Sequence, residues 1–258
     1  MIEPDKGLAD YLAKDADVVA TSSKDWEPEY LALSRLVEIF RRLSALVVVK
    51  DANLNLPAQL FLVVLNQSYG VASELLRRRT RDAQALTRRA VEAAGVAHRL
   101  WKHPELIPVF NEAYPHMNDS DHPKQFRPSD KYRSEFSYTQ LFAGDSSALK
   151  TLESLIEVFS VGATHAGVGA LVWQKWEDTF LKLSVRETDR VEIGRAWLSV
   201  ITAYWEMLRV FFAILKPTVV QDGMAEAVEL DMKNWLEAFR KTLKERTPWI
   251  SDADKLAL

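Results

Sequence analysis

The 258-residue chain contains no cysteine. This absence excludes disulfide bonds, thiol catalysis and cysteine-ligated metal sites, and it is typical of a protein in a reducing compartment. The strongest apolar runs, Leu60–Leu65 and Val210–Leu215, are far shorter than the roughly 20 residues of a membrane-spanning helix. The acidic N-terminal segment lacks the apolar core of a secretory signal. We therefore expect a soluble, cytoplasmic protein with no membrane partner.

Glycine and proline are scarce, at nine and ten residues, which is too few turn-forming residues for a protein of many short strands. Apolar side chains instead recur at spacings of three and four, as in amphipathic helices. The sequence predicts an all-α protein, a single bundle of seven or eight helices over residues 26–247. Residues 1–25 are interpreted as a polar, loosely packed lead-in and residues 248–258 as a loose tail.

Several expected helices have a proline or a capping side chain at their start, where either one favours helix formation. These residues are Pro28, Pro57, Ser129 and Thr188. The segment from Ser129 to Phe142 is expected to form one helix. The helix after Pro57 opens with the apolar run Leu60–Leu65, so we expect it to be buried on several sides.

Two helices are expected at the centre of the bundle. The helix Thr80–Trp101 has mostly alanine and glycine at its apolar positions, and small side chains let neighbouring backbones approach closely. The helix Thr188–Leu215 is rich in aromatic residues and apolar over much of its circumference. That pattern favours a place in the core or in the seam of a dimer.

The stretch near 170–185 departs from the helical pattern, because residues 180–185 are rich in strand formers. A small β-hairpin that turns at Glu177-Asp178 is one interpretation. A helix that continues through the stretch is the other, and the sequence does not decide between them.

The common sequence signatures of nucleotide and hydrolase sites are absent. The chain has no GxGxxG, no GxxxxGK[ST], no HExxH and no GxSxG motif, so we predict no cofactor. A polar loop contains His116, Asp119, Asp121 and His122, which are side chains that bind divalent metals. Such groupings arise by chance in polar loops, and we predict no metal site.

The densest charged feature is an arginine cluster of six residues within thirteen. Its members are Arg77, Arg78, Arg79, Arg81, Arg88 and Arg89. Guanidinium groups bind phosphate in a bidentate way, so the cluster is a candidate site for RNA or a nucleotide. The alternative is that these arginines face solvent and pair with nearby carboxylates such as Glu74 and Asp82. The net charge of −3 favours the alternative.

A polar pocket within the bundle is a second candidate site. Arg88 and Glu92 are four residues apart, so the sequence predicts an ion pair within one helix. His98 lies further along the same helix and is a candidate member of the pocket. His165 lies among small residues, between Gly162 and Gly169, which is compatible with a general base or with a ligand contact.

The run Thr87–Ala97, followed by Trp101 and His103-Pro104, resembles an uncharacterised family of prokaryotic helical proteins similar to HEPN-like domains. The resemblance implies a helical bundle of the kind found in toxin–antitoxin and phage-defence systems. HEPN-like ribonucleases carry an arginine, four to six residues and then a histidine. This chain departs from that pattern, since only three residues separate Arg99 from His103 and eight separate Arg89 from His98.

The leading functional hypothesis is therefore a non-catalytic helical domain that binds a protein partner, a nucleotide or RNA in a defence or stress response. One alternative is an enzyme with a pocket around Arg88, Glu92 and His165. Another is an oligomeric scaffold or homodimer, built on the heptad-like pattern of residues 194–215.

Overall fold

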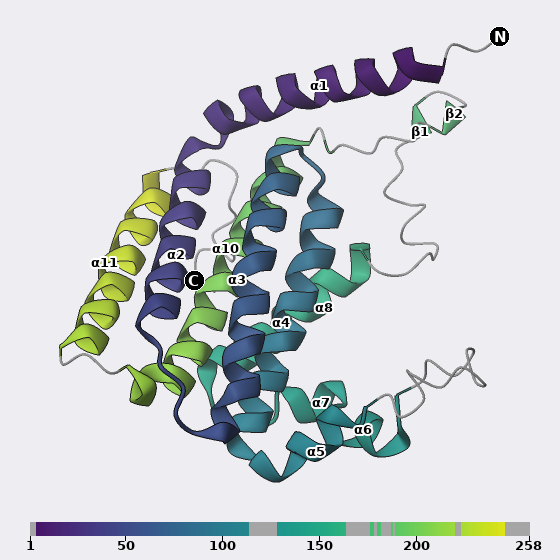
Figure 1. The fold of residues 1–258 in the computed structure, drawn as a ribbon. Helices are drawn as coiled ribbons and strands as arrows, with labels where there is room; N and C mark the ends of the chain where they lie inside the picture. The colour runs from purple at the N-terminus through teal and green to yellow at the C-terminus, as the bar shows by residue number, and fades with distance from the viewer. Residues whose placement is uncertain are drawn as a thin grey trace.

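A computed structural model describes residues 4–113, 128–163, 176–177, 180–181, 187, 189–219 and 223–245. The structure confirms an all-α bundle, and seven of the described helices have 17 residues or more (Figure 1). These long helices are α1 (Pro4–Asp25), α2 (Glu27–Leu46), α3 (Asn55–Leu76), α4 (Thr80–Lys102), α8 (Ser147–Ala163), α10 (Arg190–Leu215) and α11 (Met224–Glu245).

Short helical elements connect the long ones. They are η1 (Ala52–Leu54), η2 (Pro104–Leu106), α5 (Ile107–Asn111), α6 (Asp130–Glu135), α7 (Tyr138–Leu141) and η3 (Lys216–Thr218). Ser129 caps α6, as predicted, because its Oγ accepts from the Tyr132 N–H at 3.2 Å. The expected single helix after Ser129 is nevertheless two, since Ser137 takes an extended conformation and starts α7.

The described part of residues 170–185 forms a short antiparallel pair. Strand β1 (Trp176–Glu177) pairs with β2 (Phe180–Leu181), with Trp176 opposite Leu181. Two residues, 178 and 179, separate the strands. The remainder of the stretch, with the rest of the proposed hairpin, lies outside the described residues.

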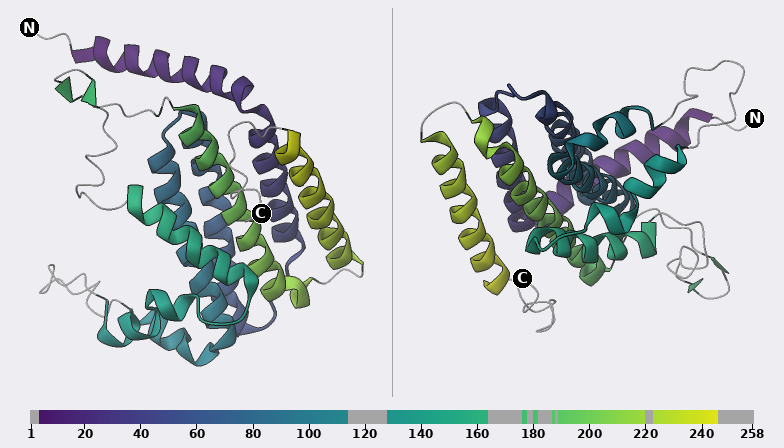
Figure 2. Two further views of the ribbon diagram at one scale, coloured as in Figure 1. Left: turned by 180° about the vertical axis from the view of Figure 1, so that it is seen from behind. Right: turned by 90° about the horizontal axis from the view of Figure 1, so that it is seen from below.

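Helix α10 is the centre of the bundle and contacts α2, α3, α4 and α8. Helix α11 lies along the outer side of α2 (Figures 1 and 2). Val47, after α2, forms a β-bridge with Val219, after η3, so α2 and α10 end at the same end of the bundle. Helix α3 runs back along α2, and α4 returns along α3, packed against α10 and α8.

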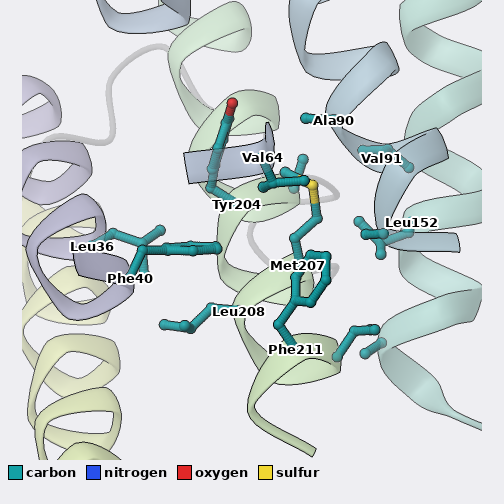
Figure 3. Close-up of a cluster of buried hydrophobic side chains, with 14 of the residues drawn as sticks. Leu36, Phe40, Val64, Ala90, Val91, Leu152, Tyr204, Met207, Leu208 and Phe211 are labelled. Atoms are coloured by element: carbon teal, nitrogen blue, oxygen red, sulfur yellow. The ribbon is translucent and has the colours of Figure 1, made fainter. Parts of the chain in front are cut away.

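The buried surface of α10 explains its central position. Its described side chains from Ile193 to Leu215 are mostly buried, and Figure 3 shows Tyr204, Met207 and Phe211 surrounded by side chains of the neighbouring helices. The centres of the Phe61 and Phe211 rings lie 5.2 Å apart. Residues 190–218 are also the described segment long and apolar enough to cross a membrane, but 72% of its apolar window is buried inside the bundle. The sequence-based prediction of a core helix is confirmed.

Three details differ from the sequence-based expectations. The lead-in of residues 1–25 forms the helix α1 from Pro4 onward. The cap of α10 is Asp189, whose carboxylate accepts from the Val191 N–H at 2.8 Å, whereas Thr188 was the expected cap. Leu62 and Val63 of α3 are 48% and 43% exposed, because only one side of this apolar helix meets the bundle.

Two glycines in the central helices provide a matched test of close packing. A Cβ on Gly95 of α4 would lie 3.1 Å from the Leu141 Cβ, an atom fixed to the α7 backbone. A Cβ on Gly70 of α3 would lie 3.4 Å from the flexible Leu86 Cδ1. We expect Gly95→Ala to lower the free energy of unfolding by about 1–2 kcal/mol through overpacking. We expect Gly70→Ala to raise it by up to about 1 kcal/mol through helix propensity.

Urea denaturation of the two variants measures both changes. Equal stabilisation by the two substitutions would show that α7 does not pack closely against Gly95.

Candidate functional site

The turn between α3 and α4 contains the first arginines of the cluster and has an uncommon backbone. Arg78 has φ 58°, in the left-handed region. Its N–H donates to the Leu75 carbonyl, and the Arg79 N–H donates to the Glu74 carbonyl, both at 2.9 Å. These two bonds define a Schellman motif, in which glycine usually occupies the left-handed position. An arginine in this conformation has a strained backbone. The contacts of its side chain offset that strain.

The Arg78 side chain holds α1 against the bundle. Its Nε donates to Ser22 Oγ at 2.9 Å, and its Nη2 lies 3.1 Å from Asp25 Oδ2. The Arg78 carbonyl also accepts from the Glu187 N–H at 2.7 Å, just before α10 begins. This one residue therefore joins α1, the α3–α4 turn and the approach to α10.

Asp15 of α1 is a second anchor, buried at the same end of the bundle. It accepts from Arg77 Nε at 2.7 Å and lies 3.3 Å from Arg79 Nη2. Glu74 Oε1 lies 3.6 Å from Arg77 Nη1, and Glu74 Oε2 lies 3.4 Å from Arg79 Nη1. Arg77, Arg78 and Arg79 thus all pair with carboxylates of the same chain, which reduces the positive charge they offer to an external anion.

The other candidate residues on α4 are spread along the helix. Arg88 and Glu92 form the predicted ion pair, with 2.9 Å between Nε and Oε1. Arg81 is half-buried, and Arg89 is exposed. His98 is ten residues beyond Arg88, about 15 Å along the axis. It therefore does not extend the Arg88–Glu92 pair into one pocket.

His165, which the enzyme hypothesis places beside Arg88 and Glu92, lies outside the described residues, as do His116, Asp119, Asp121 and His122. Among the residues that the structure describes, no group of three histidines or carboxylates is placed to hold a metal ion.

A surface groove of about 630 Å³, which sequence reasoning missed, lies where the end of α4 meets the start of α8. We call it the α4–α8 groove. It is lined by His98, Trp101 and Lys102 from α4, by Gly144 and Ser146 before α8, and by Arg209 from α10. These residues come from three separate parts of the chain, so no local motif could reveal them.

The groove contains several nitrogen donors. Lys102 Nζ lies 3.9 Å from the centre of the Trp101 ring. Arg209 donates to Ser147 Oγ at 3.1 Å and to Glu206 Oε2 at 2.7 Å, and these bonds occupy only part of its five N–H groups. The first N–H groups of α8 have no acceptor within their own helix. Asp145 also lines the groove, but its carboxylate is fully exposed and lies 3.8 Å from Lys150 Nζ.

The His98 imidazole is neutral at physiological pH. Burial lowers its pKa to about 4, and the neighbouring Lys102 and His103 add to that effect. A neutral imidazole can donate or accept one hydrogen bond without repelling Lys102. The positive groups that line the groove are therefore Lys102, Arg209, whose charge is partly offset by Glu206 at 2.7 Å, and the positive end of the α8 dipole.

Comparisons of the chain with protein-family models, with curated proteins and with solved structures found no match.

The anchor of α1 can be tested by the substitution Asp15→Ala. Because Arg77 and Arg79 would lose a shared acceptor, we expect the free energy of unfolding to fall by about 1–3 kcal/mol, between the values for exposed and buried ion pairs. Backbone amides of α1 should also exchange with solvent faster. Asp17→Ala, a matched change at an exposed position, should alter stability by less than about 0.5 kcal/mol. If the two variants lowered the free energy of unfolding equally, Asp15 would not anchor α1.

The half-buried position of His98 predicts a specific dependence of stability on pH. The folded pKa of about 4 is below the ordinary value of 6.5, so the folded protein binds this proton less readily than the unfolded chain. The contribution of His98 to stability is complete above pH 6.5 and is lost as the pH falls toward 4. Denaturation curves measured at several pH values between 6.5 and 4 give the free energy of unfolding. It should fall more steeply with decreasing pH for the wild type than for His98→Gln. If the free energy of unfolding of the two proteins changed equally with pH, the pKa of His98 would not be lowered by folding.

Proposed function

We propose that this protein is a non-catalytic helical domain that binds a small, phosphate-bearing ligand in the α4–α8 groove. The observation that carries the proposal is the meeting of Lys102, Arg209 and the N-terminal end of α8 around one concave surface. Separate cationic groups and free backbone N–H groups that face one cavity are the usual elements of a phosphate site.

The size of the groove favours a small ligand over a long polyanion. Its volume of about 630 Å³ is within the range of roughly 300–1,000 Å³ for small-molecule sites. A long RNA would need an extended basic surface. The Arg77–Arg79 part of the cluster, which is the densest basic stretch, is instead paired with Asp15, Asp25 and Glu74.

The cellular location and the biological process are also part of the proposal. A cysteine-free chain fits a cytoplasmic location. The resemblance of Thr87–Ala97 to HEPN-like relatives supports a place in a defence or stress response. A nucleotide is a suitable signal in such a setting, because it carries phosphate and is small enough for the groove.

Calorimetric titration with ribose 5-phosphate at low ionic strength tests the site. We expect binding that Lys102→Ala weakens about tenfold, through loss of one charged hydrogen bond. Lys233→Ala makes the same change at an exposed position on α11 and should leave the affinity unchanged. Asp145→Asn should strengthen binding, since it removes a negative charge from the groove.

The absence of binding by the wild-type protein at low salt would refute the proposal, as would equal losses in the two lysine variants. A parallel titration uses a single-stranded RNA of twelve nucleotides. Tighter binding of that RNA, with a steep salt dependence that Arg81 and Arg89 variants remove, would favour the arginine cluster instead.

A further inference from the structure

A second hollow adjoins the α4–α8 groove, between α8, α10 and α11. Its volume is about 410 Å³, and we call it the aromatic pocket. Trp205 of α10 and Trp235 of α11 stack with ring centres 5.0 Å apart and planes 16° from parallel. Phe239 continues the stack at 5.0 Å from Trp235, with planes 21° apart. The wall of the pocket is thus a column of three nearly parallel rings.

The column is fixed to α2 on the side away from α8. The Trp235 indole N–H donates to the Ala32 carbonyl of α2 at 2.8 Å, and Trp235 and Phe239 are both buried. Trp205, at the other end of the column, is only partly buried. The pocket is therefore lined by aromatic rings that already pack on one another, and Trp205 is the more exposed end of the column.

Polar groups complete the pocket. Glu206, which is 8% exposed, lies on its wall together with Thr151 and Thr202. A carboxylate can accept hydrogen bonds from the amino group of a base, and the threonine hydroxyls can donate or accept. The pocket therefore combines a stacking surface with hydrogen-bonding groups, as a site for a nucleobase requires.

Arg209 joins the two hollows. It lines both the aromatic pocket and the α4–α8 groove, and its side chain lies between Glu206 of the pocket and Ser147 at the start of α8. Ser147 and Thr151 are one turn apart on α8. A ring in the pocket and a phosphate in the groove would thus be neighbours across a single arginine.

We infer that the aromatic pocket and the α4–α8 groove form one nucleotide site, in which the base stacks in the pocket and the phosphate binds beside Arg209 and Lys102. This inference rests on the proposed function, because the groove supplies the phosphate half of the site. It narrows the ligand class from any phosphate-bearing molecule to a nucleoside phosphate.

Calorimetry with three probes separates the two halves. Ribose 5-phosphate tests the groove alone, adenosine tests the pocket alone, and adenosine 5′-monophosphate tests both. We expect adenosine 5′-monophosphate to bind at least about tenfold more tightly than ribose 5-phosphate, the gain that stacking of one base provides.

Two variants test the pocket. Trp205→Leu should remove the advantage of adenosine 5′-monophosphate and leave the affinity for ribose 5-phosphate unchanged. Tyr69→Leu makes a matched change at an exposed aromatic residue on α3 and should alter neither affinity. If Trp205→Leu fails to fold, Thr151→Phe fills the pocket from α8 without removing a ring and should have the same selective effect.

The outcomes are distinguishable. If ribose 5-phosphate binds and adenosine 5′-monophosphate binds no more tightly, the pocket inference is wrong and the proposed function stands. If no phosphate-bearing probe binds, both fail. If adenosine binds while ribose 5-phosphate does not, the groove is not a phosphate site and the single nucleotide site is refuted.

Discussion

The burial of α10 is the constraint on which the structure depends. This helix carries apolar side chains around most of its circumference, so water must be excluded from almost all of it. Four helices, α2, α3, α4 and α8, surround it. The small residues of α4 also allow close packing on another side of this helix, where Gly95 lies beside Leu141 of α7 and Phe142. The two groups of polar residues considered as sites lie at the α3–α4 turn and beside the end of α4, where Arg209 of α10 lines the α4–α8 groove.

The two ends have different characters. At the α3–α4 end, the abundant positive charge is matched by Asp15, Asp25 and Glu74, and Arg78 accepts a strained backbone in order to hold α1. At the α4–α8 end, fewer positive groups are present, but they face a hollow that is open to solvent. Charge density alone would select the first end. Lys102, and Arg209 beyond its bonds to Glu206 and Ser147, line a hollow that is open to solvent, which selects the second end. Lys102 and Arg209 are therefore better placed than the arginine cluster to bind an external anion.

Local patterns predicted what depends on neighbours in sequence. The central helices followed from periodicity, the Ser129 cap from side-chain type, and the Arg88–Glu92 pair from its spacing of four. The anchors of α1 could not be predicted, because Asp15 and Arg77 are 62 residues apart. For the same reason α1 was expected to be a loose segment, since its own sequence gave no sign of the arginines that hold it. The groove and the aromatic pocket require four helices to be placed together, which no single motif records.

Nuclear magnetic resonance mapping of adenosine 5′-monophosphate tests the location of the site most directly, because it reports every backbone amide and every tryptophan indole at once. The account predicts that the largest shifts occur in the Trp205 indole and in the amides of Lys102, Ser147 and Arg209. Shifts that gather instead on Asp15 and on Arg77–Arg81 would contradict it, and would show that the ligand displaces α1 from the arginine cluster.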